Sequence, residues 1–396
     1  MTDEQRRVAG DESRLGTNAP ALVSQEPNVS PTLEPRLTGG GPVQAAPVAR
    51  HSSVAAAVLP PLVALLVALV AGDLLILAFG QSPAAVYRLL IEGTWGNAYG
   101  IGQVLYKATT ITFTGLAVSL GLRAGLFNIG AEGQLAAGGF AAALAGLLLP
   151  AGTPALLAVP ACLLAAALGG ALVGAVPGAL KARFGAHEVI VTIMINFIVL
   201  ALLNYAVAAH LRVPETLHTP EIRAGAVPRL GDIASAFRGS AANLTILAAV
   251  AAAVALGWYL FRTRAGYELR ATGLQPDAAE YAGVRVPRVW LATLALSGAL
   301  AGLGGVNFVL GYKRYYEDGF AGGAGFLGIA VALVGRNHPL GVVLAALFFA
   351  TLSQGGLAIN SLVPKQMVEV MQGIVILAVA VSVPEVRRIL GARKAS

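Results

Sequence analysis

The chain has few charged residues: Asp, Glu, Lys and Arg make up 12% of its 396 positions. A soluble domain carries about 25%, so this shortage excludes an ordinary soluble protein. Hydrophobic residues make up 56% of the chain, and its mean hydropathy is +0.73. Runs of about 18 or more mostly apolar residues recur, and each is long enough to cross a bilayer as a helix. The composition therefore predicts a membrane protein.

Motifs for catalysis, metal binding and nucleotide binding are also missing. The one cysteine, Cys162, lies in an apolar run and can form no disulfide within the chain. The five histidines are dispersed, and no H-E-x-x-H motif occurs. There is no G-x-x-x-x-G-K-[ST] loop, and "GAGFLG" at 323–328 lacks the strand and helix of a dinucleotide site. We predict no catalytic residue, metal site or cofactor, and expect that the chain is not an enzyme.

The two ends of the chain differ from its middle. Residues 1–50 are rich in Pro, Gly, Ser, Thr and charge, which predicts a disordered cytoplasmic tail and not a signal peptide. Residues 51–386 are predicted to form the transmembrane domain, and residues 387–396 a basic cytoplasmic C-terminal tail. The net charge of +7 is scattered over the loops, which argues against nucleic-acid binding.

The apolar runs predict an all-α polytopic membrane protein with about ten transmembrane helices. The predicted spans are 54–79, 104–121, 127–149, 154–178, 188–210, 243–261, 289–310, 323–335, 340–359 and 367–384. The third and the eighth are rich in glycine and the least regular, so we expect broken helices there.

The predicted spans divide into two halves of about five helices with opposite orientation, as an inverted repeat requires. "GLFNIGAEGQLAAGGFAAA" and "GFAGGAGFLGIAVALVG" occupy similar places in the two halves. Gly-interrupted apolar segments at such places point to a transport site. Lys and Arg are more frequent in the loops that are inside if both termini are cytoplasmic, so we predict that orientation in the cytoplasmic membrane.

"RAGLFNIGAEGQL" at 123–135 places polar residues inside an apolar region. Its glycines weaken a helix by about 1 kcal/mol each, and Glu132 would cost at least ~2.5 kcal/mol if it faced lipid. The segment should therefore face the protein interior. Either Glu132 and Gln134 bond neighbouring backbone in a helix contact, or Asn128, Glu132 and Gln134 belong to a broken helix that lines a permeation path.

A second polar stripe lies in "AHEVIVTIMINFIVLALLNY" at 186–205. Thr192 and Asn196 are four residues apart and share a helix face. They are expected either to join helices or to line the same path, with Asn196 near the broken segment. Glu188 is expected to cap its helix or to pair with Lys181 or Arg183.

The basic loop 262–288 predicts a short helix on the cytoplasmic side. Asp277 is the expected N-cap, Glu280 completes a capping box, and Gly283 is a plausible stop. A helix of about one and a half turns is not stable alone in water. It must dock either on the inner face of its own protein or on a cytoplasmic partner.

Four ordered motifs resemble a known family: "GLFNIGAEGQ", "HEVIVTIMINFI", "ELRATGLQPDAAEYAGV" with "LALSGALAGLGG", and "GIAVALVGRNHPLGVV". They are similar to the permease subunit of bacterial ABC importers, in the simple-sugar and nucleoside group related to the ribose permease. "FNIGAEGQ" resembles the nucleoside branch. The resemblance covers about 54–384. His187 departs from it, because an Asn commonly precedes the Glu in this family.

The resemblance implies an importer that moves nucleosides across the cytoplasmic membrane. It implies a second permease subunit, expected as a heterodimer, a cytoplasmic ATPase subunit and an extracytoplasmic substrate-binding protein. It also implies that the short helix couples to the ATPase. The residues expected to do so are Asp277, Ala278, Ala279, Glu280, Tyr281 and Gly283.

Other functions stay open from the sequence. A pentose or other simple-sugar permease would share the motifs. An ion-coupled secondary transporter would explain Glu132 as a proton or sodium site, but not the 277–283 helix, nor the lack of a second intramembrane carboxylate besides Asp73. An intramembrane enzyme would need a nucleophile with its base, or a metal cluster, and the sequence offers neither.

Overall fold

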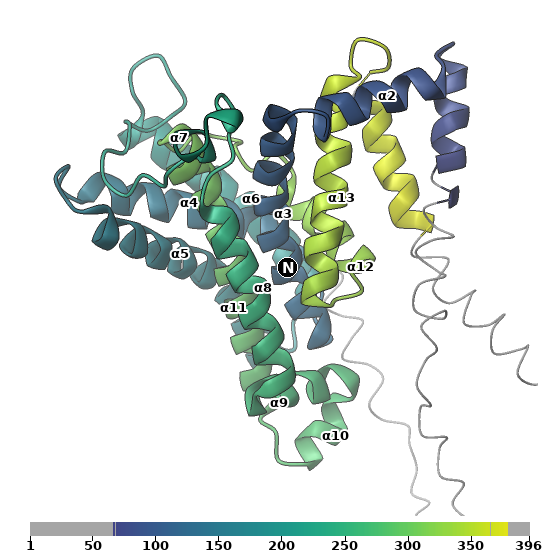
Figure 1. The fold of residues 1–396 in the computed structure, drawn as a ribbon. Coiled ribbons are helices and arrows are strands. Elements are labelled where there is room, and N and C mark those ends of the chain that lie inside the picture. Colours follow the sequence, from purple (N-terminus) through teal and green to yellow (C-terminus); the bar gives the residue numbers. More distant parts are fainter. Residues whose placement is uncertain (1–65, 68, 365, 379–396) are drawn as a thin grey trace, which may run out of the picture. The chain divides into compact units, whose positions relative to one another are not determined.

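The computed structural model describes residues 66–67, 69–364 and 366–378 (Figure 1). All of these described residues belong to one compact unit. The predicted tails at 1–50 and 387–396 lie outside the described residues. So do most of the first half of the first predicted span and the end of the tenth.

The described residues form helices and contain no β-strand, which confirms the all-α fold class. The helices of the bundle are α3 (Ala98–Arg123), α4 (Ala131–Leu148), α5 (Ala155–Phe184), α6 (Glu188–Ala206), α8 (Thr245–Arg262), α11 (Val286–Phe308), α12 (Ala324–Val334) and α13 (Pro339–Ala358). Shorter helices are α2 (Pro83–Thr94), α7 (Leu230–Ile233), α9 (Arg264–Leu274) and α10 (Pro276–Tyr281), and a 3₁₀ turn covers Ser235–Phe237. The π-helices Val207–Leu211 and Val309–Lys313 continue α6 and α11.

Six of the described helices are long and apolar enough to cross a membrane: α4, α5, α6, α8, α11 and α13. A seventh span results if Leu69–Ala78 and α2, which meet at a bend of 111°, count as one broken helix. α12 and Gln366–Ala378 are apolar but shorter. The chain is a multi-pass membrane protein, and the count of ten spans stays a prediction.

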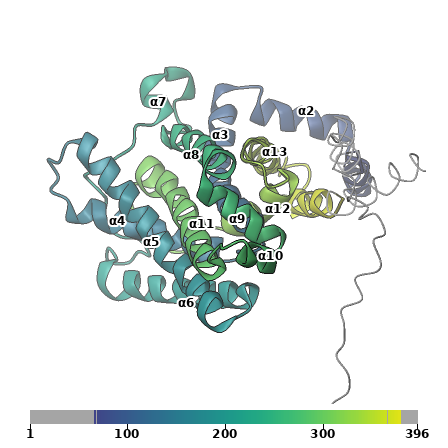
Figure 2. The same cartoon turned by 90° about the horizontal axis from the view of Figure 1, so that it is seen from below.

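The central helices α3 and α11 each pack on helices of the other half of the chain. α11 packs on α4 and α5, whereas α3 packs on α12 and α13. In Figure 2, α4 and α5 accordingly lie on one side of α11, and α12 and α13 lie on the side of α3. Each half thus packs its central helix on helices of the other half, which is consistent with two related halves of opposite orientation.

Glycine allows α5 and α11 to approach until their backbones touch. A Cβ on Gly170 would lie 2.1 Å from the Gly298 carbonyl oxygen, and one on Gly298 would lie 2.2 Å from that of Gly170. Lipid tails are as apolar as the helix surfaces, so the hydrophobic effect does not drive membrane helices together. Close packing of small residues holds them together instead. The seam fixes the position of α11 and hence of the helices around it.

Both glycine-rich segments are interrupted. α3 ends at Arg123 and α4 begins at Ala131, with Gly125 at φ +73° between them. The helix α4 thus begins four residues later than the predicted third span at 127–149. In the second half, α12 has only 11 residues, about 16 Å at 1.5 Å per residue. That is half of the ~30 Å hydrocarbon core.

The predicted short helix is present as α10, but its predicted capping is wrong. Gln275 is the N-cap, no side chain caps the helix, and Pro276 occupies its first turn ahead of Asp277. Pro is suited to this place because its φ is already helical and it needs no hydrogen-bond acceptor. The helix therefore begins before Asp277, whose carboxylate lies in the first turn. Gly283, at φ +87°, provides the expected stop.

Candidate functional site

Asn128 organises the break between α3 and α4. Its side-chain amide donates hydrogen bonds to Gln134 Oε1 at 2.8 Å and to Ser297 Oγ of α11 at 2.7 Å. Its Oδ1 accepts from the Gly130 N–H at 2.9 Å and from Gln134 Nε2 at 3.2 Å. Asn commonly stabilises turns in this way, by bonding the backbone two residues on. The amide holds the loop closed and fastens it to the central helix α11.

The polar stripe of α6 supplies partners for the backbone groups that the break exposes. Asn196 Oδ1 accepts from the Gly133 N–H at 2.9 Å, and its amide donates to the Ile129 carbonyl at 2.9 Å. Thr192 Oγ1 lies 3.3 Å from the Ile129 N–H, which donates to it. Unpaired backbone groups are costly in the apolar membrane interior. The expected proximity of Asn196 to the broken segment is confirmed.

Glu132 joins the two halves of the chain. It lies in the first turn of α4 and is only 6% exposed. Its Oε1 accepts from the Gly323 N–H at 2.8 Å, and its Oε2 accepts from the Gly325 N–H at 2.7 Å. These N–H groups belong to the first turn of α12, where a helix offers free donors and the positive end of its dipole. One carboxylate therefore caps α12 from the start of α4.

The N-termini of α4 and α12 meet at this carboxylate. A Cβ on Gly325 would lie 2.3 Å from the Glu132 backbone nitrogen, so only glycine fits there. Two positive helix ends with a buried anion between them form a stable electrostatic arrangement. Of the two interpretations of the sequence, backbone bonding by Glu132 describes the contacts observed. Whether the break also borders a permeation path stays a prediction.

Glu188 pairs with Lys181, one of the partners expected for it. Lys181 Nζ lies 2.6 Å from Glu188 Oε2, and the ammonium also lies 5.0 Å from the centre of the Trp290 ring. His187, the position that departs from the family pattern, is the N-cap of α6 and makes no capping hydrogen bond with its side chain. The ion pair ties the end of α5 to the start of α6.

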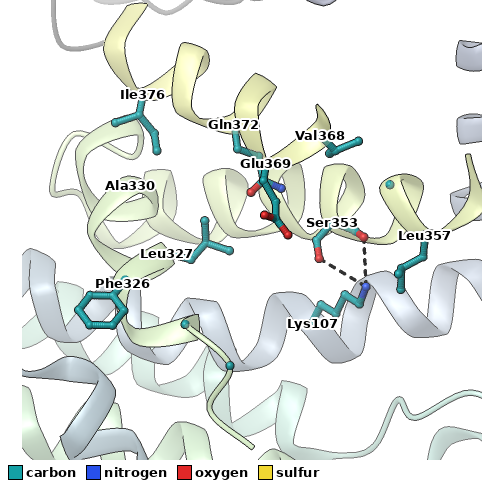
Figure 3. A pocket seen from close by; sticks show the side chains of 13 residues that line it. Lys107, Phe326, Leu327, Ala330, Ser353, Leu357, Val368, Glu369, Gln372 and Ile376 are labelled. Carbon is teal, nitrogen blue, oxygen red and sulfur yellow. Dashed lines mark hydrogen bonds between the residues drawn. The ribbon is translucent and has the colours of Figure 1, made fainter. Parts of the chain in front are cut away.

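A cavity of about 430 Å³ was not foreseen from the sequence (Figure 3). Its polar residues are Lys107 of α3, Ser353 of α13, and Glu369 and Gln372 of the helix Gln366–Ala378. Lys107 Nζ donates to the Ser353 carbonyl at 3.2 Å and to its Oγ at 3.4 Å.

Ionisable residues inside predicted apolar spans were the signal that could have revealed this cavity. Lys107 falls in the predicted span 104–121 and Glu369 in the span 367–384. The expectation that Asp73 is the one carboxylate besides Glu132 within the spans is therefore wrong, because Glu369 is another.

The family of the chain follows from comparison with known proteins. The family described as "branched-chain amino acid transport system / permease component" matches residues 100–380. The chain belongs to this permease family. It is a transport permease and not an enzyme.

Three relatives of this permease are similar along most of its length. The guanosine ABC transporter permease protein NupP of Bacillus subtilis is 40% identical over 82% of the chain and 93% of its own length. The nucleoside ABC transporter permease protein NupB of Lactococcus lactis is 35% identical over 82% and 91%. The glucose ABC transporter permease protein TsgB13 of Haloferax volcanii is 35% identical over 80% and 85%. No solved structure matches the chain.

The permease presents α10 at the far end of α8 and α9 (Figure 1). Ala279 is 5% exposed and attaches α10 to the protein, whereas the Tyr281 side chain is 99% exposed. The other predicted coupling residues are also exposed: Asp277, Ala278, Glu280 and Gly283. A helix packed fully on its own inner face, one of the two expectations, would not leave a Tyr in solvent.

Proposed function

We propose that this protein is the membrane-spanning permease subunit of an ABC importer for nucleosides, powered by a separate ATPase subunit. The observation that carries the proposal is the likeness to a guanosine permease and a nucleoside permease, 40% and 35% identical over 82% of the chain. The sequence holds no phosphate-binding loop, so ATP must bind to another chain. The ATPase, a second permease subunit in a heterodimer and an extracytoplasmic binding protein complete the importer.

The proposed solute pathway runs beside the paired breaks. Five polar residues build its wall by holding non-helical backbone in place: Asn128, Glu132, Gln134, Thr192 and Asn196. Irregular backbone at membrane depth is tolerated where it is buried in protein or lines a cavity. The segment at 322–324, whose N–H groups include one bonded to Glu132, borders the cavities beside Lys107. This continuity supports a role for the polar cluster in shaping the pathway.

The alternatives differ in their support. A sugar importer is favoured by one observation, the 35% identity to a glucose permease. An ion-coupled transporter has less support, because both oxygens of Glu132 accept hydrogen bonds from α12 and the relatives are ABC permeases. The sugar importer is therefore the second candidate.

Uptake in a deletion strain tests the proposed function. Cells that lack the gene should take up labelled guanosine, adenosine or uridine more slowly than cells that carry it, by at least about tenfold at low concentration. Ribose and glucose uptake should be unchanged. Loss of sugar uptake with normal uptake of every nucleoside would replace the proposal with the sugar importer.

The proposed orientation places both termini and α10 in the cytoplasm. Ala282, next to α10, and Gly152, between α4 and α5, should then lie on opposite sides of the membrane. In a Cys162→Ala background, Gly152→Cys should react with a membrane-impermeant maleimide in intact cells. Ala282→Cys should react only after the cells are permeabilised. Efficient labelling of the Ala282 variant in intact cells would contradict the proposed orientation and place α10 outside the cytoplasm.

A further inference from the structure

Two cavities adjoin at Lys107, and together they form what we call the double chamber. The first has a volume of about 430 Å³ and the second about 310 Å³. Both are within or close to the range typical of small-molecule sites, about 300–1,000 Å³. The residues that line both are Lys107, Gly322, Gly323, Leu327 and Ser353. The shared lining makes them neighbouring compartments of one space between α3, α12 and α13.

The first compartment is polar. Figure 3 shows Lys107, Ser353 and Glu369 directed toward one another from three helices, with Gln372 one turn beyond Glu369. An ammonium, a hydroxyl, a carboxylate and an amide offer both donors and acceptors. Vicinal hydroxyl groups on a small solute need such a mixture, because each hydroxyl donates once and accepts. Lys107 and Glu369 also fall in predicted spans, where a charged side chain marks a solute pathway more often than a lipid face.

The second compartment is aromatic. Tyr106, Phe308 and Phe320 line it, together with small residues of the 320–324 segment. The rings of Phe308 and Phe320 are stacked with their centres 4.9 Å apart. Aromatic side chains provide flat surfaces on which a nucleobase stacks with little dependence on its identity. A sugar alone has no planar aromatic ring to stack on these side chains.

The glycines between the compartments keep the space open. Gly322 and Gly323 have φ of +51° and +84°, and a Cβ on Gly323 would meet no atom within 4 Å. A side chain at Gly323 would therefore extend into open space at the junction of the two compartments. The Gly323 N–H is held by Glu132 at 2.8 Å. The polar cluster thus positions the wall that both compartments share.

We propose that the double chamber is a solute-binding site of the permease that takes a nucleoside, with the base in the aromatic compartment and the ribose hydroxyls at Lys107, Ser353, Glu369 and Gln372. The inference rests on the proposed nucleoside function and adds the residues that contact the solute. The lining supports this assignment, because the aromatic compartment suits a planar ring and the polar compartment suits a polyol.

Protection of an introduced thiol tests occupancy of the site. The complete importer, with its ATPase, partner permease and binding protein, carries Ser353→Cys or Gln372→Cys in a Cys162→Ala background. Saturating guanosine should slow the reaction of either thiol with a small methanethiosulfonate reagent at least about threefold. Ser361→Cys, at an exposed position beyond α13, is the matched control and should react at the same rate with or without guanosine.

Transport by variants of the aromatic compartment gives a second, independent measurement. Phe320→Leu should lower guanosine uptake about tenfold, since base stacking contributes about 1–3 kcal/mol. Phe197→Leu, at an exposed ring on α6, should leave uptake unchanged. Co-purification of the partner subunits shows that each variant assembles.

The outcomes separate this inference from the proposed function. Guanosine uptake by the importer without protection at Ser353→Cys or Gln372→Cys would overturn the double chamber as the site and leave the nucleoside function standing. Uptake of sugars but of no nucleoside would overturn the proposed function and the ligand class assigned here. Protection by guanosine at both positions, with the control unaffected, is the expected result.

Discussion

Glu132→Gln should reduce nucleoside uptake at least about tenfold while the chain still assembles in the membrane. The carboxylate accepts from the N–H groups of Gly323 and Gly325, at 2.8 and 2.7 Å. A Gln side chain keeps one acceptor oxygen, but its amide group would point a donor at the second N–H. Hydrogen bonds to charged groups are worth about 1.5–3 kcal/mol each, and the anion between two helix ends is also lost. The first turn of α12 should therefore shift.

Assembly should survive because the rest of the bundle does not depend on this carboxylate. α5 and α11 keep their glycine seam, and Asn128 and Asn196 keep their bonds to the break. Uptake of labelled nucleoside is measured beside the amount of permease that co-purifies with its ATPase. Glu132→Asp keeps the charge on a shorter side chain and should retain more uptake than Glu132→Gln. Normal uptake by an assembled Gln variant would limit the carboxylate to a structural role.

The broken helices could be predicted from the sequence because the signal is local. Glycines weaken the helix within the segment itself, and a polar cluster in an apolar region has to face protein. The break before α4 and the short α12 follow from these residues alone. The shared face of Thr192 and Asn196 also follows from their spacing of four residues.

The partners of those residues could not be predicted, since they depend on contacts between distant segments. Glu132 and Gly323 are 191 positions apart, and no local pattern indicates that one caps the helix of the other. Lys107 and Glu369 were visible as ionisable residues in apolar spans, but only the fold places them at one cavity. The error at Asp277 has a local cause: Pro276 allows the helix to begin earlier than the capping pattern indicates.

The contact between α4 and α12 joins the two predicted inverted halves. Each half has one helix that begins at a glycine-rich break, and the two beginnings touch at Glu132. A change in the distance between the halves must therefore alter the cap, the 322–324 segment and the double chamber together.

Tyr281→Ala should weaken association with the ATPase subunit about 30-fold or uncouple ATP hydrolysis from substrate. ATP must bind to another chain, so the energy has to cross a cytoplasmic surface that is ordered and joined to the spans. We propose α10 as this surface, because Ala279 attaches it to the protein and Tyr281 is 99% exposed. Exposed Tyr is enriched among the anchors of interfaces, whose truncation costs about 2 kcal/mol or more. That cost corresponds to a roughly 30-fold change in affinity.

Co-purification of the ATPase and nucleoside-stimulated hydrolysis measure the effect in the assembled importer. Tyr205→Ala is the matched control, because Tyr205 is also exposed but lies on α6, far along the chain from α10. The membrane bundle should stay folded in both variants, since Tyr281 makes no buried contact there. If Tyr281→Ala combined with Glu280→Ala leaves association and stimulated hydrolysis unchanged, α10 is not the docking element. The segment 179–187, held at its end by the Lys181–Glu188 pair, would then be the next surface to test.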